Sequence, residues 1–312
     1  MAKGNLTGTS EFLLLGLSEV PEHQLLLFIS FLSMYLVAVL GNLLIVLAIS
    51  STPQLHMPMY FFIASLSCVD VCFTSVTMPK MLLNIHSHSP AIPFAGCLAQ
   101  MYFLILFLEL DNVLLAVMAY DRFVAICHPL HYATVMSPKF CATSLLVALV
   151  VTNVYPLTHI VLIARMSFCA SVRIRHMFCE LYALLQLSCS DIRSNELTVY
   201  TLGSLLFVTP FLFISFSYTR IFAAILRLPS SQSRLKAFST CSSHLAVVSL
   251  FYGTLFGVYL RPSSSYTVGD SVATVLYAVV APMLNPFIYS LRNKAMKEAV
   301  RGLLSRRQPS SW

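Results

Sequence analysis

Seven long runs of apolar residues divide this chain, and they constrain its fold more than any other feature. About 20 helical residues cross a bilayer core of about 30 Å, and each run is long enough to do so. The chain is 58% hydrophobic and 10% charged, with a mean hydropathy of +0.81, so a water-soluble protein could not cover its apolar surface. We therefore expect an all-α membrane protein, folded as a seven-transmembrane helix bundle. The runs span residues 25–49, 57–82, 98–120, 140–164, 197–226, 237–260 and 270–291.

The distribution of charge predicts the orientation in the membrane. Of the 19 Lys and Arg residues, twelve fall on one side of the bundle and seven on the side of the N-terminus. The seven are balanced by seven acids, whereas only Asp121 and Glu298 oppose the twelve. The positive-inside rule therefore places the N-terminus outside and the C-terminus inside. The basic inner face suits anionic lipid or an acidic partner, and no basic-aromatic domain for nucleic acid is present.

The two ends of the chain have different expected roles. Residues 1–24 form an outer segment, in which Asn5 begins an N-glycosylation acceptor triplet. This segment lacks the pattern of a secretory signal, so we expect the first helix to direct insertion. Residues 25–291 form the membrane domain. Residues 292–312 form an inner tail that begins with a short amphipathic helix on the inner leaflet and has no cysteine for a palmitoyl anchor.

The nine cysteines divide by compartment. Four lie on the oxidising outer face, and four cysteines allow three pairings. The other five lie in the membrane or inside, where we expect free thiols. Because no tight Cys/His cluster has the spacing of zinc ligands, the sequence does not support a zinc site. The outer cysteines are Cys97, Cys169, Cys179 and Cys189, and the others are Cys68, Cys72, Cys127, Cys141 and Cys241.

An acid and an arginine, Asp121 and Arg122, lie side by side where the third run leaves the membrane. Placing an ionised group near hydrocarbon costs free energy, so such groups are found there when they are paired and have a functional role. We expect Asp121 to hold Arg122 in a charge-assisted pair at rest, and the opened pair to free Arg122 for another helix or a partner protein.

Residues 118–132, which contain this pair, closely resemble the corresponding segment of olfactory receptors, within the rhodopsin-like G-protein-coupled receptors. The segment 236–244 is the most specific match, together with Tyr252 where most other rhodopsin-like receptors have Trp. The sequence of residues 128–132 is similar to that of the tetrapod-type (class II) group. One departure is Phe123, where the family often carries Tyr. Further matching segments are 41–42, 55–62, 66–70, 217–218, 251–253 and 282–293.

The resemblance implies a receptor in the plasma membrane of olfactory sensory cilia, not an enzyme. It would bind a volatile organic odorant and activate a heterotrimeric G protein of the olfactory stimulatory type, which raises cyclic AMP. No cofactor is implied beyond a possible sodium ion. The alternative is a non-olfactory rhodopsin-like receptor for a small amine or metabolite. A transporter would show paired repeats or broken helices, and a hydrolase a convincing triad, and we find neither pattern. The implied disulfides are Cys97–Cys179 and Cys169–Cys189.

Resemblance and helical spacing together predict a mostly apolar ligand pocket with a few polar groups, as small organic ligands require. For each aliphatic residue taken alone, plain helix packing is the competing interpretation. The third helix would supply Leu104, Ile105, Leu108, Glu109 and Asn112, and the fifth Leu202, Gly203 and Leu206. The sixth would supply Tyr252, Leu255, Phe256 and Tyr259, and the seventh Val275 and Ala278.

A second set of residues is predicted to couple ligand binding to the inner face. Pro286 lies inside the seventh helix, where it frees a carbonyl and permits a kink. Tyr218 and Tyr289 would point toward Arg122 when the helices rearrange. The competing interpretation is a static kink that only aids packing. The full switch set is Asp121, Arg122, Tyr218, His244, Asn285, Pro286 and Tyr289.

Three acids lie within the apolar runs. Asp70 and Asp111 have no neutralising base, so they hold a proton, capture a cation such as sodium with oxygens from Asn42, Ser67 and Asn285, or are inert hydrogen-bonded acids. Glu109 lies two residues from Asp111, so on a helix the two face nearly opposite ways. Glu109 is either an anchor for a hydrogen-bonding or cationic ligand, or a protonated acid tied to a hydroxyl on the fourth or fifth helix; the second interpretation is slightly favoured.

Overall fold

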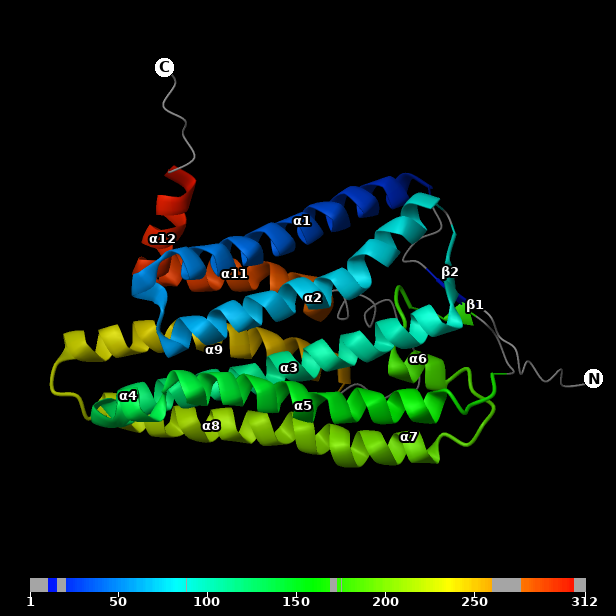
Figure 1. Cartoon of the computed structure of the whole chain (residues 1–312). Coiled ribbons are helices and arrows are strands. Elements are labelled where there is room, and N and C mark those ends of the chain that lie inside the picture. Colours follow the sequence, from blue (N-terminus) through cyan, green and yellow to red (C-terminus); the bar gives the residue numbers. More distant parts are fainter. Residues whose placement is uncertain are drawn as a thin grey trace, which may run out of the picture.

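The computed structural model describes residues 11–15, 21–87, 89–168, 173–174, 176–259 and 276–305, and it shows an elongated bundle of helices (Figure 1). The seven-helix bundle expected from the apolar runs is confirmed. Short helices α4 (Tyr132–Val135), α6 (Leu181–Leu185) and α12 (Lys294–Ser305) lie at its ends. The long helices are α1 (Pro21–Ser51), α2 (Pro58–Ser87), α3 (Phe94–Cys127), α5 (Pro138–Ile163), α7 (Arg193–Thr198) continuing into α8 (Ser204–Leu226), α9 (Ser231–Tyr259) and α11 (Ala281–Arg292).

Five of the described helices can cross a membrane by length and hydropathy alone: α1, α2, α3, α5 and the continuous α7–α8 unit. Helices α9 and α11 complete the bundle; α9 begins with a polar turn, and the apolar part of the seventh helix is shorter, Ala278–Ser290. The apolar runs mark only the part of each helix in hydrocarbon. Helix α3 continues past residue 120 and ends at Cys127. The next residue, His128, precedes Pro129, and proline disfavours the helical conformation in the residue before it.

Local signals explain other boundaries. Helix α5 begins with Pro138 at its first position, and the Ser137 hydroxyl caps it by accepting a hydrogen bond from the Phe140 backbone at 3.3 Å. A π-helical segment, Val199–Gly203, joins α7 to α8, and a second, Leu276–Val280, leads into α11. Residues 270–275 of the seventh predicted run lie outside the described part of the chain.

Helices α1 and α11 pack closely around a proline. Pro286 has no backbone N–H, so the carbonyl of Pro282, four residues earlier, loses its helical donor. The Asn42 side chain of α1 donates to that carbonyl at 3.0 Å. A Cβ on Gly41 would lie 3.2 Å from the Pro286 ring, so the glycine permits this approach. The proline-containing helix is therefore held by a hydrogen bond from its neighbour.

A small sheet closes the outer end of the bundle. Strand β1 (Glu11–Leu14) pairs antiparallel with β2 (Ala91–Pro93) and parallel with β3 (Arg173–Ile174). Phe12 and Leu14 are buried beneath it. These strands were not predicted from the sequence, because each has only two to four residues and carries little periodic signal.

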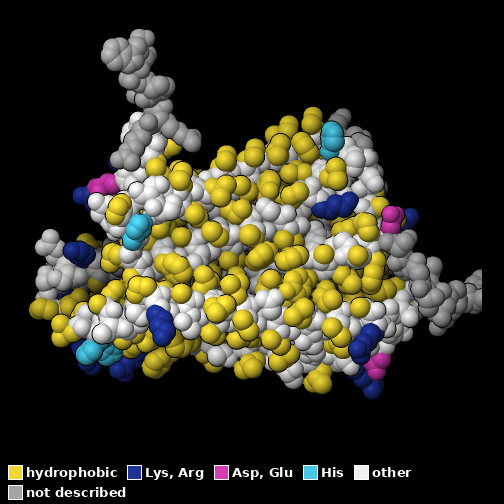
Figure 2. Space-filling model, in the orientation of Figure 1, with side chains coloured by type: hydrophobic (Ala, Val, Ile, Leu, Met, Phe, Trp, Pro, Cys, Tyr) yellow, Lys and Arg dark blue, Asp and Glu magenta, His cyan; other side chains and the backbone are white. Residues whose placement is uncertain are grey.

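The flank of the bundle carries the surface expected of a membrane protein. Figure 2 shows hydrophobic side chains over the middle of one face and charged side chains near its two ends. Helix α12 (Lys294–Ser305) turns away from the bundle beside the inner ends of α1 and α11 (Figure 1). Its Met296 is fully buried, while Lys294, Lys297 and Arg301 are exposed. The short amphipathic helix expected in the tail is therefore present.

Candidate functional site

The outer loop is fastened to the third helix. The disulfide Cys97–Cys179 that the resemblance implied is present and ties α3 to the loop. Cys189 is also disulfide-bonded, while Cys169, the partner expected for it, lies outside the described residues. The five cysteines expected to be free are free. Asn5, the predicted glycosylation site, lies outside the described residues.

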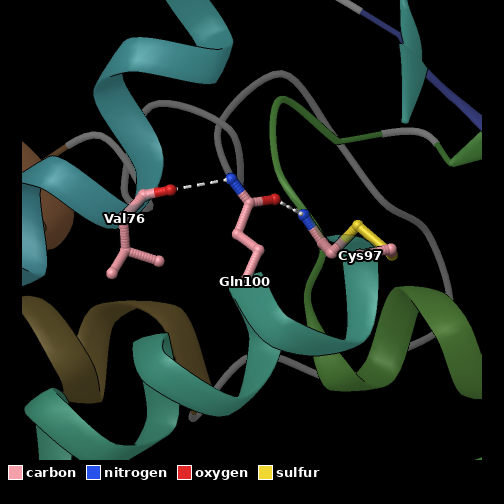
Figure 3. The surroundings of a disulfide bond; sticks show 4 residues. Val76, Cys97 and Gln100 are labelled. Atoms are coloured by element: carbon pink, nitrogen blue, oxygen red, sulfur yellow. Dashed lines mark hydrogen bonds between the residues drawn. A yellow bond between two sulfur atoms is a disulfide. The ribbon is translucent and has the colours of Figure 1, made fainter. Parts of the chain in front are cut away.

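Gln100 adds a second fastening beside this disulfide (Figure 3). Its amide nitrogen donates to the Val76 carbonyl of α2 at 3.0 Å, and its amide oxygen accepts from the Cys179 backbone N–H at 2.9 Å. Pro79 has no N–H for the carbonyl of Ser75, the residue before Val76, so it interrupts the hydrogen-bond ladder of α2 in this region. Gln100 thus joins α2, α3 and the outer loop, a role that the sequence analysis missed.

The loop segment beside the disulfide inserts into the bundle. Met177 and Phe178 are almost fully buried and belong to one apolar cluster with Leu104, Leu255 and Ala278 of the predicted pocket. They form a roof over that part of the pocket. The imidazole of His176 also lies in this roof, 3.3 Å from the Glu180 carboxylate, and burial lowers the pKa of His176 to about 4. His176 is therefore neutral at neutral pH.

The predicted apolar pocket residues that the structure describes belong to three hydrophobic clusters, one of which contains Tyr252. Leu104, Leu255 and Ala278 share a cluster with the roof, while Ile105, Leu202 and Leu206 pack with Tyr155 of α5. Leu108 lines a different cavity, described below. The side chain of Tyr259 and all of Val275 lie outside the described residues.

Aromatic side chains of α8 form the part of this region that the sequence analysis missed. Phe207 and Phe211 lie one helical turn apart, with ring centroids 5.3 and 4.9 Å from that of Tyr252. Both rings also contact Phe256. The i, i+4 spacing of the two phenylalanines was the available signal. These rings place a strongly apolar surface beside the predicted anchor residues.

A polar network crosses this aromatic surface. The Tyr252 hydroxyl donates to the Asn112 side-chain oxygen, and the Asn112 nitrogen donates to the Leu206 carbonyl at 3.0 Å. The network therefore joins α3, α8 and α9. Asn112 also lies within hydrogen-bonding reach of the Glu109 carboxyl. The hydroxyl from the fourth or fifth helix that we expected on Glu109 is not among its hydrogen-bond partners; the described partner, Asn112, is on its own helix.

Asp70 and Asp111 face one small cavity between α2, α3, α9 and α11. Its volume is about 20 Å³, which suits one water-sized occupant. The Asn285 amide donates to Asp70 at 2.9 Å, while one Asp111 oxygen is buried without a partner. Asn285 lines the cavity as expected. Asn42 and Ser67, the other expected oxygen ligands, do not line this cavity; the Asn42 nitrogen donates to the Pro282 carbonyl, while its side-chain oxygen has no hydrogen-bond partner.

At the inner end, Asp121 does not pair with Arg122. Among the described residues, Asp121 accepts a hydrogen bond from the Tyr132 hydroxyl at 2.8 Å, and no ion pair joins it to Arg122. Burial raises the pKa of Tyr132, so this hydroxyl stays protonated and remains a donor. The expected resting pair is therefore not found, because the inner loop supplies a competing donor.

His244 links three helices beneath the network described above. One ring nitrogen, Nε2, lies 3.1 Å from the Leu115 carbonyl of α3, and the other, Nδ1, lies 2.8 Å from the Tyr218 hydroxyl of α8. A carbonyl only accepts, so Nε2 carries the proton and Nδ1 accepts from Tyr218. The neutral imidazole of α9 thus bridges α3 and α8.

The inner end is hollowed beside Arg122. A cavity of about 210 Å³ is lined by Arg122, Tyr289, Asn293 and residues of α2, α9 and α12. Arg122 interacts electrostatically with Tyr218, His244 and Tyr289. The hydroxyl of Tyr289 is buried without a hydrogen-bond partner. The structure therefore brings together Arg122 with three members of the predicted switch set. Asn285 lines the acid cavity and Pro286 contacts α1.

The sequence and the fold of this chain are both similar to those of known proteins. Residues 31–307 match the family model described as olfactory receptor. Olfactory receptor 1N2 of Homo sapiens is 60% identical over 297 residues, covering 95% of this chain and 94% of the relative. Olfactory receptor 1D2 of Homo sapiens is 56% identical over 306 residues, covering 98% of each. The crystal structure of squid rhodopsin has the same fold, with a TM-score of 0.72 at 18% identity over 93% of this chain and 82% of that one.

Proposed function

The chain belongs to the olfactory receptor family, and from this premise we propose that it detects small volatile organic molecules in the outer half of its bundle and activates a stimulatory heterotrimeric G protein. This G protein would raise cyclic AMP at the plasma membrane of sensory cilia. The family consists of receptors, not enzymes. The observation that carries the proposal is the division of labour along α3: Glu109 and Asn112 face the aromatic region, and Arg122 lines the inner cavity.

The ligand compartment is the region beneath the outer-loop roof. Apolar residues supply most of its surface, and the Tyr252–Asn112–Leu206 network supplies orientation. A ligand that packs against Tyr252 acts directly on α9, because Tyr252 belongs to that helix. It shifts the conformational equilibrium only by its difference in affinity for the two states.

The inner response is an outward movement of α9. The His244 bridge to α3 and α8 opposes that movement, so activation requires its hydrogen bonds to break or exchange. Movement of α9 would widen the cavity beside Arg122, whose lining includes Ser239, Thr240 and Ser243 of that helix. The G protein would insert there, against a basic face that suits an acidic surface.

The cavity of Asp70 and Asp111 would hold a proton or a sodium ion in the resting state. Two carboxyls and the unpartnered Asp111 oxygen fit a single cation, and the volume of about 20 Å³ admits little more. Because residues of α2, α3, α9 and α11 line this cavity, a bound cation or proton would favour the resting arrangement of these helices. Replacing both acids with Asn should remove the sodium and pH dependence of signalling; unchanged dependence would contradict this assignment.

The tail helix would lie on the inner leaflet. Met296 anchors it to the bundle, and the exposed Lys294, Lys297 and Arg301 would contact anionic headgroups.

The main experiment is a cyclic-AMP assay over a chemically varied odorant panel, with wild type and Arg122→Ala. We expect the variant to reach the cell surface but to lose signalling to every agonist, because Arg122 lines the inner cavity. Lys297→Ala is the matched control, since it removes an exposed inner charge away from that cavity. A normal agonist response in Arg122→Ala would refute the proposed coupling site.

A further inference from the structure

Glu109 is a buried acid that the protein leaves incompletely satisfied. The residue is 6% exposed, and its Oε2 atom has no hydrogen-bond partner. No ion pair to Glu109 is found among the described residues. Leaving a carboxyl oxygen unpartnered away from water costs free energy. Such an atom in a ligand compartment marks the place where a bound molecule supplies the missing partner.

The surrounding network specifies the kind of partner. The Tyr252 hydroxyl is used as a donor to Asn112, and the Asn112 nitrogen is used toward the Leu206 carbonyl and the Glu109 carboxyl. The Tyr252 hydroxyl and the Asn112 nitrogen are therefore committed to protein acceptors. What the site lacks is a further donor directed at Glu109 Oε2, and this donor has to come from the ligand.

Two tyrosine side chains lie near the same position. Tyr155 and Tyr252 both interact electrostatically with Glu109, and Phe207 packs against Tyr252. A Cβ on Gly203 would lie 2.8 Å from the Tyr155 hydroxyl, so the glycine at the end of the π-helical segment makes room for this ring. Aromatic faces attract cations, and they do so most strongly when water is excluded.

The other acid of this helix turn serves a different compartment. Asp111 lines the small cavity with Asp70 and Asn285, whereas Glu109 does not line it. Because the two acids are two residues apart, they project to nearly opposite sides of α3. A cation beside Asp111 would therefore not satisfy Glu109, and the unpartnered oxygen of Glu109 requires its own explanation.

We propose that Glu109 binds the ammonium group of a small apolar amine, an assignment that rests on the proposed odorant-receptor function. The ammonium donates to the free carboxylate oxygen and lies among the faces of Tyr155 and Tyr252. The apolar chain of the amine packs against Phe207, Phe211 and Phe256. Glu109 is thus a specificity-determining residue, and the ligand class is primary or secondary amines with a hydrocarbon chain.

The test compares molecules that differ only in the polar group. Cells expressing the full-length receptor are exposed to octylamine, octanol and octanal, and cyclic AMP is measured with surface expression. We expect octylamine to be the strongest agonist. This comparison uses the wild-type protein alone, so it does not depend on whether any variant folds.

Glu109→Gln then removes the charge while keeping the shape. We expect its half-maximal octylamine concentration to rise about tenfold or more, since a buried charge pair is lost, with little change for octanol. Glu196→Gln, an exposed acid on α7, is the matched control and should leave the octylamine response unchanged.

Three results would overturn the amine assignment: a silent octylamine response, an octanal response stronger than that to octylamine, or an octylamine response unaffected by Glu109→Gln. The octanal result would show that Glu109 is protonated and donates to a carbonyl. A response to octanol or octanal without one to octylamine would leave the proposed receptor function intact. Loss of all responses across the wider odorant panel would instead count against that function.

Discussion

The outer and inner ends of the bundle are held together in different ways. At the outer end, the Cys97–Cys179 disulfide, the two hydrogen bonds of Gln100 and a three-stranded sheet fix the loop over the helices. At the inner end, the bridge through His244 and the Tyr132–Asp121 contact consist of single hydrogen bonds beside a cavity of about 210 Å³. Covalent and multiple fastenings resist local opening, whereas single hydrogen bonds exchange readily. This difference predicts that the outer end is the fixed frame and that the inner end is the part that moves.

Removing the disulfide should have the largest effect of the substitutions considered, because it weakens the more firmly held outer end of the bundle. Cys97→Ser opens a loop whose ends are 82 residues apart, and the chain-entropy model assigns such a crosslink about 4 kcal/mol. We expect poor surface expression, a lower thermal midpoint of the purified receptor and loss of agonist response. Cys68→Ser, which alters an exposed free thiol, is the control. If Cys97→Ser matched that control, the outer end would not be the fixed frame.

The second prediction concerns the inner bridge. His244→Phe keeps a ring of similar shape but removes both hydrogen bonds, leaving the Leu115 carbonyl and the Tyr218 hydroxyl without their partner. Each lost partner of a buried polar group costs about 1–3 kcal/mol. Because the bridge opposes movement of α9, we expect basal cyclic AMP to rise above wild type at equal surface expression.

The comparison variant is Ser242→Ala on the same helix, whose hydroxyl bonds only to its own helix backbone. It should leave basal signalling nearly unchanged. Reduced basal signalling in His244→Phe would mean that the bridge stabilises the active arrangement instead.

A smaller effect is expected at the other fastening of the outer end. Gln100→Leu leaves the Cys179 N–H unpaired and removes the side-chain donor of the Val76 carbonyl, while the disulfide stays in place. We expect a loss of about 2 kcal/mol in stability, read as a lower thermal midpoint, together with altered ligand preference because the roof loses its position. Basal signalling should not rise, in contrast to His244→Phe.

Gln186→Leu places the same substitution at an exposed position next to α6 and serves as the control. Should Gln100→Leu behave like this control in both readouts, the disulfide alone would position the roof.

The same contrast explains what the sequence predicted. Helix periodicity and hydropathy are local properties, so the seven helices and the carbonyl freed by Pro286 were accessible from the sequence. The outer strands and Gln100 depend on contacts between segments distant in the sequence, such as residue 100 with residues 76 and 179. No local pattern reports those contacts. The outer frame was therefore harder to predict than the helices it covers.

At the candidate site, sequence reasoning found residue types more reliably than their partners. The pairing of Asp121 with Arg122 was expected because the two are adjacent, yet neighbours on a helix point about 100° apart, and Tyr132 competes for the acid. The hydrogen bond expected between Glu109 and a hydroxyl of a neighbouring helix is not found for a related reason. The partner of Glu109 depends on how α3 packs against α5 and α8, which the sequence does not show. A buried acid can be recognised from sequence, but its hydrogen-bond partner cannot.

The smallest predicted effect concerns the Tyr132 hydroxyl, which competes with Arg122 for the Asp121 carboxylate. Tyr132→Phe removes only the hydroxyl that Asp121 accepts, a bond of about 1 kcal/mol at a partly exposed position. Freed of it, Asp121 can turn to the neighbouring Arg122, which would hold the arginine away from a partner. We therefore expect basal and agonist-driven cyclic AMP to fall severalfold at unchanged surface expression. Tyr200→Phe, on the exposed outer surface, should change neither. An increase in signalling for Tyr132→Phe would show that its contact restrains the inner end rather than keeping Arg122 available.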